Sequence, residues 1–332
     1  MKKIIAVILC AALFAAFVPC AFAADGQSFG AYKHVIIIGI DGAGRFIEKA
    51  DTPEFDRIFK DGALTYTART ETKTDSAPNW GSILTGVSYF ETGLENGVSD
   101  EKTRTSETEH PTLFTFLRKA DREAELASFV HWDNINRGII ETDIDINRVD
   151  IQDDEKLTDA ICEYFDAGNK PELFFVQLDD VDGAGHGKGS NSEEYFRQIN
   201  ITDGYLGRIY DAVEENGLMD DSLFIVVADH GHTAAGGHGG ITMRESQVTL
   251  AVKGKTVEKG GKIGTEARNR DVAAIALYAL GMERPAEFTS IVPSGVFSDV
   301  KGETRPFFKD PADDILGSLA WFVTLLTSVI GM

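Results

Sequence analysis

Four short apolar runs, separated by segments of helical periodicity, constrain the fold of this chain more than any other feature of its sequence. The runs are mostly rich in β-branched or aromatic residues and lack clear polar alternation, which is typical of strands covered by helices on both faces. They are 34–40, 126–130, 173–178 and 223–227. Apolar residues at helical spacing predict helices at 111–120, 154–165, 192–216 and 271–280. Alternating strands and helices predict an α/β fold with a mostly parallel sheet.

A single domain accounts for residues 32–310. No internal repeat stands out, and the segments 100–109 and 134–154 are too short to form a separate domain. Hydrophobic residues make up 43% of the chain, which is enough for a real core and excludes a disordered acidic tail. The sequence therefore predicts one α/β domain with insertions.

The first 24 residues have the pattern of a secretory signal peptide. Lys2 and Lys3 precede an apolar run, and Ala21-Phe22-Ala23 supplies small residues at a cleavage site. A retained membrane helix is the alternative, but the small-residue site follows the apolar run at once. We expect segment 1–24 to be removed and the protein to be exported to the periplasm, the cell envelope or the medium.

Residues 315–332 carry no charge and would extend roughly 27 Å as a helix, just short of a bilayer core. Two interpretations compete: a C-terminal helix packed on the domain, or a membrane anchor that tethers an exported protein. The absence of Lys or Arg after the run argues against a stop-transfer segment, whereas its all-round apolarity argues against a surface helix. We favour the anchor.

The formal net charge of −21, from 32 basic and 53 acidic side chains, limits the partners of this chain. Most of its surface would repel nucleic-acid backbones and anionic membranes, so we expect no nucleic-acid-specific binding. A small anionic substrate stays compatible with this charge where bound cations offset the acidic groups. No pattern indicates the oligomeric state.

Carboxylates and imidazoles follow three of the predicted strands directly. Asp41 ends the first strand, Asp179, Asp180 and Asp182 follow 173–178, and Asp229-His230 follows 223–227. The C-terminal edge of a parallel sheet is where open α/β folds bind ligands. A single Asp after a strand is usually a turn or cap residue. Three such strand ends, two of them followed by His, predict a binding site.

The spacing of these residues indicates divalent cations. Asp182 and His186 are four residues apart in a glycine-rich segment interpreted as a loop, and His230, His232 and His238 also lie among glycines. Oxygen and imidazole ligands without thiolate suit zinc, manganese or similar ions. The alternative is a flexible glycine loop with solvated histidines. It would require four of the seven histidines to lie beside strand-end acids by accident. For His232 itself, and for Lys188, a solvated position is the simpler expectation.

Ser76 is a candidate nucleophile. It lies where a loop enters a helix, with Pro78 at a first-turn position. A hydroxyl there is close to unpaired backbone N–H groups and the positive end of the helix, which suits a phosphate or a sulfate. Alone, Ser76 would be interpreted as an N-cap. Beside a two-metal cluster, a catalytic role is favoured.

Taken in order, these motifs resemble the alkaline phosphatase superfamily over roughly residues 33–282, and most closely its nucleotide pyrophosphatase/phosphodiesterase (type I phosphodiesterase) branch. The resemblance implies an alkaline-phosphatase-like three-layer α/β/α sandwich and two divalent cations, with zinc expected and manganese or calcium as alternatives. It implies that one cation is held by Asp182, His186 and His238, and the other by Asp41, Ser76, Asp229 and His230. Ser76 would carry a covalent phosphoseryl intermediate. Asn96 resembles the family's phosphate-binding Asn, and a turn role is the alternative.

The leading hypothesis is an exported two-metal hydrolase of phosphoric esters, a phosphodiesterase or nucleotide pyrophosphatase acting on a phosphorylated small molecule. A phosphomonoesterase or sulfatase of the same superfamily is the enzyme alternative. Ser76-x-Pro78 fits the sulfatase signature, but Trp80 stands where that signature has Arg. A non-catalytic anchored binding protein is the third hypothesis. The intact Ser76 and all six other candidate ligands argue against it.

Overall fold

The predicted strands lie in one eight-stranded sheet of a computed structural model that describes residues 27–305. The strand order is β4-β3-β5-β1-β6-β7-β2-β8. All neighbouring strands are parallel except β7, which runs antiparallel to β6 and β2. The strands are β1 His34–Ile40, β2 Ala63–Arg69, β3 Leu126–Val130, β4 Asn147–Asp150, β5 Leu173–Leu178, β6 Ser222–Val227, β7 Gln247–Lys253 and β8 Gly261–Lys262. The predicted α/β class and mostly parallel sheet are confirmed.

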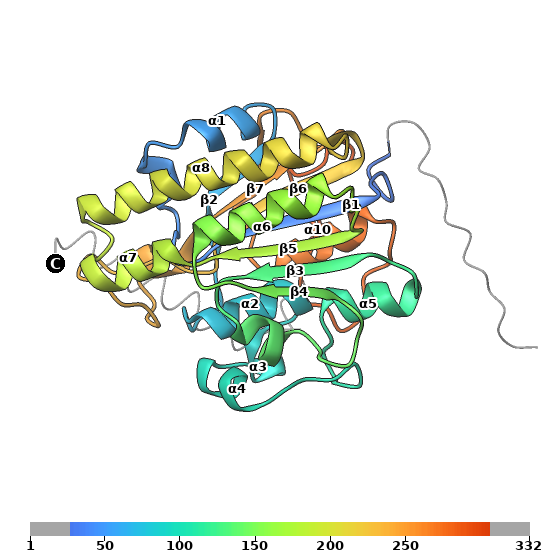
Figure 1. The fold of residues 1–332 in the computed structure, drawn as a ribbon, viewed down its shortest axis with the longest axis horizontal. Coiled ribbons are helices and arrows are strands. Elements are labelled where there is room, and N and C mark those ends of the chain that lie inside the picture. Colours follow the sequence, from blue (N-terminus) through green and yellow to red (C-terminus); the bar gives the residue numbers. More distant parts are fainter. Residues whose placement is uncertain (1–26, 306–332) are drawn as a thin grey trace, which may run out of the picture.

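Helices cover both faces of this sheet (Figure 1). In one layer α1, α6 and α7 pack on α8, and in the other α2 contacts α3, α4 and α10. Figure 1 shows α6 and α8 across one face and α10 on the opposite face. The helices are α1 Pro53–Phe59, α2 Ser76–Thr85, α3 Tyr89–Thr92, α4 Asn96–Glu101, α5 Leu113–Ala120, α6 Asp154–Asp166, α7 Asp180–Lys188, α8 Glu193–Glu215, α9 Met243–Ser246 and α10 Asp271–Ala279. The result is the expected three-layer α/β/α sandwich.

The central strands form the core because both of their faces are apolar. Every residue of β5 and β6 is buried, as are all residues of β1 after His34. Such strands lose their apolar surface to helices on both sides, which is the main favourable term in folding. The polar residues of these strands, His34, Gln177 and Ser222, lie at or next to a strand end, and the site forms beyond the C-terminal ends.

One predicted loop is a helix. Asp182 and His186 lie in α7, although Gly183 and Gly185 lower its intrinsic helix propensity. Packing of α7 on α8 outweighs that propensity. Because residues four apart share a helix face, the helix itself brings the two side chains together.

Both chain ends carry predictions that lie outside the described residues. These are the signal peptide at 1–24 and the apolar helix at 315–332. Within residues 27–305, no helix has both the length and the apolarity needed to cross a bilayer.

Candidate metal centre

The C-terminal ends of β1, β5 and β6 bring the predicted acids and histidines together. Asp41 follows β1, α7 begins directly after β5, and Asp229 and His230 follow β6. These three strands are adjacent and parallel, so their ends meet at one edge of the sheet. The site therefore follows from strand order rather than from sequence proximity.

A first cluster consists of Asp41, Asp229 and His230. The Nε2 atom of His230 lies 3.5 Å from Oδ1 of Asp41 and 3.2 Å from Oδ2 of Asp229. All three side chains are at most 1% exposed, and neither of these two carboxylate oxygens has a hydrogen-bond partner. Buried anionic oxygens without donors are costly, and a cation would satisfy them. The donor set of this cluster fits a divalent cation.

The other oxygen of each carboxylate is held by N–H donors. Oδ2 of Asp41 accepts hydrogen bonds from Trp80 Nε1 at 2.7 Å and from Gln177 Nε2 at 2.9 Å. Oδ1 of Asp229 accepts from the backbone N–H of Gly42 and of His230. Each carboxylate therefore presents one free oxygen to the cluster. Gln177 was not predicted as a site residue, although a lone amide inside the apolar run of β5 was a usable signal.

Burial and the closeness of the carboxylates to one another shift the pKa values of the side chains in this cluster. Burial, followed by repulsion from Asp229 and Asp182, raises the pKa of Asp41 well above its usual range. Burial raises the pKa of Asp229 to about 8 against the hydrogen bond from Gly42. Burial also lowers the pKa of His230 to about 3, so its imidazole is neutral, as a metal ligand must be. Cations would relieve the repulsion among the carboxylates.

A second cluster consists of Asp182, His186 and His238. The Nε2 atom of His186 lies 3.3 Å from Oδ2 of Asp182 and 3.0 Å from Nε2 of His238. The Nδ1 atom of His238 lies 2.8 Å from the carbonyl oxygen of Thr74, which turns Nε2 toward the cluster. The rings of His230 and His238 stack at 3.9 Å, so the two clusters are contiguous.

Ser76 lies beside the first cluster. Its Oγ is 3.2 Å from Nε2 of His230, and it is the first residue of α2. The N-cap position belongs to Asp75, so Ser76 is not the N-cap. Asn96 begins α4, and its Oδ1 accepts the backbone N–H of Ala77 at 2.9 Å. The structure therefore brings Asn96 to the first turn of the helix that carries Ser76.

The side chain of Asn79 forms hydrogen bonds with the backbone of the loop that precedes Ser76. Its Oδ1 accepts the backbone N–H of Glu71, and its Nδ2 donates to the carbonyl oxygens of Lys73 and Asp75. The side chain is fully buried. Its role depends on partners at both ends of the loop, so its position in the sequence alone did not indicate it.

A further group, His131, Asp154 and Asp180, was also missed. Oδ1 of Asp154 accepts a hydrogen bond from Nδ1 of His131 at 2.8 Å. The two carboxylate oxygens of Asp154 also accept hydrogen bonds from the backbone N–H groups of Asp179 and Asp180. With both oxygens occupied by donors, Asp154 ties the start of α6 to the ends of β3 and β5. Of the two side chains expected in solvent, Lys188 is exposed and His232 is fully buried.

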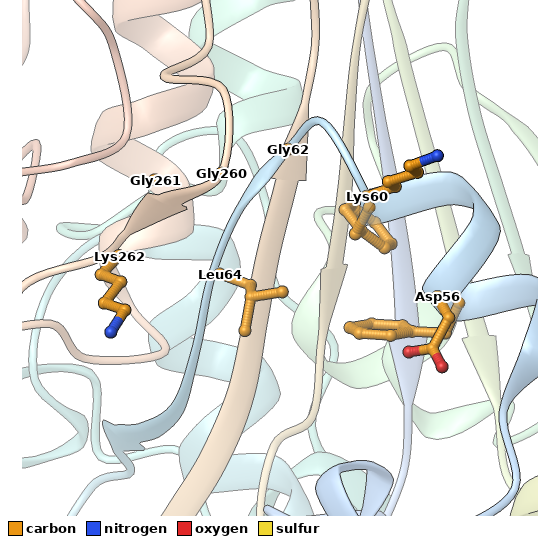
Figure 2. Close-up of a pocket in the computed structure, with 9 residues that line it drawn as sticks. Asp56, Lys60, Gly62, Leu64, Gly260, Gly261 and Lys262 are labelled. Carbon is orange, nitrogen blue, oxygen red and sulfur yellow. The ribbon is translucent and has the colours of Figure 1, made fainter.

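A separate hollow of about 310 Å³ lies beside α1, β2 and β8 (Figure 2). Its polar side chains are Asp56, Lys60 and Lys262. It lies at the start of β2, at the edge of the sheet opposite to the strand-end acids. None of the candidate site residues lines it.

Comparisons with known proteins identify relatives of this chain. The sequence model of the type I phosphodiesterase / nucleotide pyrophosphatase family matches residues 35–275. GPI ethanolamine phosphate transferase 1 of Candida glabrata is 25% identical over 161 residues, which cover 43% of this chain and 18% of the transferase. A 2,3-bisphosphoglycerate-independent phosphoglycerate mutase of Listeria welshimeri is 28% identical over 134 residues, 40% of this chain and 25% of the mutase. The chain thus spans a quarter or less of these two relatives.

Solved structures share the fold. Murine ectonucleotide pyrophosphatase / phosphodiesterase 5, as an inactive variant in complex with AMP, superposes with a TM-score of 0.63 at 15% identity, covering 76% of this chain and 96% of that one. The structure of the protein BT4656 in complex with its substrate D-glucosamine-2-N,6-O-disulfate superposes with a TM-score of 0.59 at 12% identity. The superposition covers 78% of each chain. These matches confirm the alkaline-phosphatase-like architecture expected from the sequence.

Proposed function

Because this chain belongs to the type I phosphodiesterase / nucleotide pyrophosphatase family of the alkaline phosphatase superfamily, we propose that it is an exported two-cation enzyme that cleaves phosphoric diester or pyrophosphate bonds with Ser76 as nucleophile. One observation carries the proposal. The free carboxylate oxygens of Asp41 and Asp229 converge on His230, whose Nε2 lies 3.2 Å from the hydroxyl of Ser76.

Two groups of side chains would hold the cations. In the proposal, Asp41, Asp229, His230 and the Ser76 oxygen hold one, and Asp182, His186 and His238 hold the other. Zinc is the expected metal, with manganese or calcium as alternatives. When bound, the cations would stabilise charge on the phosphoryl oxygens and make a hydroxyl or a water a stronger nucleophile at neutral pH.

In the proposed reaction Ser76 attacks phosphorus, and Asn96 and the N-terminal end of α2 bind the phosphoryl group. Oγ of Ser76 would bond to phosphorus and release its proton to solvent, while the bond from phosphorus to the leaving oxygen breaks and that oxygen keeps the electron pair. Water then attacks the phosphoseryl group, which releases the product and restores the hydroxyl. Asn96 contacts the first turn of α2 and would donate its amide N–H groups to a phosphoryl oxygen. The positive N-terminal end of α2 also favours an anion here.

Transfer to an alcohol is the second candidate. Several curated relatives are GPI ethanolamine phosphate transferases, and in this candidate function a phosphorylated Ser76 passes its group to the hydroxyl of an acceptor instead of to water. Phosphomonoester or sulfate hydrolysis remains the alternative within the superfamily. Trp80 disfavours the sulfatase, because its indole occupies the position of the signature Arg and donates to Asp41.

Turnover of aryl phosphate diester, monoester and sulfate by protein loaded with zinc, manganese or calcium tests these assignments. We expect the diester to be cleaved fastest and Ser76→Ala to abolish turnover. Adding an alcohol and resolving the products separates transfer from hydrolysis. If fully metallated protein turned over none of these esters, the non-catalytic binding protein would be favoured instead. Normal turnover by Ser76→Ala would exclude Ser76 as nucleophile.

Export and tethering complete the proposal. They rest on the sequence patterns at 1–24 and 315–332. Fractionation of expressing cells should find the protein outside the cytoplasm, and detergent should be needed to release it. Recovery in the detergent-free soluble fraction would exclude the anchor.

A further inference from the structure

His232 is a fully buried histidine beside the second cluster, not the solvated residue that the sequence favoured. Its Nε2 lies 2.9 Å from Oδ1 of Asp182. Two glycines make room for the ring. A Cβ at Gly185 would lie 2.3 Å from the His232 ring, and one at Gly42 would lie 2.8 Å from its Nε2. Burial of His232 therefore depends on residues from two distant segments, which is why sequence spacing did not predict it.

The hydrogen-bond partners of the three neighbouring histidines separate their roles. Nδ1 of His238 and Nδ1 of His230 each face a backbone carbonyl oxygen, so each carries the hydrogen there and keeps a lone pair on Nε2. In His232 the hydrogen is on the other ring nitrogen. Its Nε2 faces a carboxylate, which only accepts, so Nε2 carries the hydrogen, and its Nδ1 has no partner. A nitrogen that donates a hydrogen bond has no lone pair for a cation.

We propose that His232 is a positioning residue that fixes Asp182 for cation binding, and not itself a ligand. This inference rests on the proposed two-cation function. The hydrogen bond holds Oδ1 of Asp182, which leaves Oδ2 toward His186, 3.3 Å from its Nε2. Donors that orient a ligand in this way typically contribute 10- to 100-fold to metal affinity.

The surroundings of His232 keep this donor rigid. The backbone carbonyl oxygen of His232 accepts a hydrogen bond from Oγ of Ser190 at 2.7 Å. That Oγ in turn accepts a hydrogen bond from Nη1 of Arg244. The ring of Tyr195 lies edge-on at 6.1 Å, and its hydroxyl donates to the carbonyl oxygen of Gly42. A donor held from several sides fixes the carboxylate more tightly than a mobile one would.

Titration of Zn²⁺ alone into chelator-stripped protein, in competition with a chromophoric chelator, tests the role without any turnover. His232→Leu removes the donor, His232→Gln keeps an N–H near the position of Nε2, and His232→Asn keeps an amide that is too short to reach Asp182. We expect Leu and Asn to weaken one of the two binding events by about 10- to 100-fold and Gln to stay close to wild type. The other binding event should not change.

Several outcomes overturn the proposal. Wild-type binding by His232→Leu would show that the donor is dispensable, and a loss of affinity for one cation well beyond about 100-fold would make His232 a ligand. If the Leu variant does not fold, the Gln and Asn variants decide, and equal affinities for them would refute the role. His34→Gln, at the opposite end of β1, controls for a generic His→Gln effect. Because the readout is metal binding, it stands whether or not an ester is cleaved.

Discussion

The buried ion pair between Glu71 and Arg270, next to the loop that precedes Ser76, gives the sharpest stability prediction. Nη1 of Arg270 lies 3.0 Å from Oε1 of Glu71, and both side chains are 0% exposed. Oε2 of Glu71 also accepts the hydroxyl of Ser88, and its backbone N–H donates to Asn79. The pair therefore joins the end of β2, the loop before Ser76 and the start of α10.

Replacing Arg270 leaves the buried carboxylate of Glu71 without this counter-charge. At 3.0 Å the direct attraction is roughly 5 kcal/mol with an effective dielectric constant of 20. Arg270→Met should lower the free energy of unfolding by about 3–5 kcal/mol. At about 2–4 °C per kcal/mol, the melting temperature would fall by roughly 10 °C. The double variant Glu71→Gln/Arg270→Met should lose less than Arg270→Met alone, because no carboxylate is then buried without a counter-charge.

Urea denaturation of metal-stripped protein, followed by circular dichroism, measures these free energies. Lys33→Met is the matched control, because Lys33 pairs with Asp221 at 2.7 Å on the surface and should contribute less than about 1 kcal/mol. If Arg270→Met also stays within about 1 kcal/mol of wild type, the pair contributes no more than a surface pair and the reasoning is wrong.

Three further predictions concern the strand ends. Gly39→Ala places a Cβ 2.3 Å from the Trp80 ring and should lower the free energy of unfolding by about 1–3 kcal/mol, measured by denaturation. Gln177→Met removes a donor to the first cluster and should weaken Zn²⁺ binding about 10- to 100-fold by competition titration. Burial opposes a rise in the pKa of His131, but the hydrogen bond to Asp154 and nearby carboxylates outweigh it and raise that pKa. Its stabilising contribution is thus complete below the ordinary pKa of 6.5 and lost as pH rises through the higher folded-state value. In denaturation measurements from pH 6 to 9, His131→Asn should remove that pH dependence, and an unchanged profile would refute the assignment.

The fold was predictable where the local pattern carried the information. The apolar runs of β1, β5 and β6 predicted buried parallel strands, and the acids that follow them predicted the edge at which the site forms. In contrast, four strands were missed. β4 is short and largely exposed, and β2, β7 and β8 pair with strands far away in the sequence. β7 also runs antiparallel, which no strand-helix alternation indicates.

The site residues show the same division. Asp41, Asp182 and Asp229 were found from their positions after strands, since strand order brings those ends together. The burial of His232 could not be found that way, because Gly42 and Gly185 create its space only in the folded chain. Prediction therefore succeeded for residues placed by strand topology and failed for those placed by side-chain packing.

The most direct test of the central claim is to trap the covalent intermediate on Ser76. Zinc-loaded protein would be mixed with bis(p-nitrophenyl) phosphate, quenched in acid within milliseconds, digested and examined by mass spectrometry. The mechanism predicts a p-nitrophenyl phosphoryl group on the peptide containing Ser76, released p-nitrophenolate in matching amount, and neither in Ser76→Ala. Product formation at the wild-type rate by Ser76→Ala, with no modified peptide in the wild type, would contradict it.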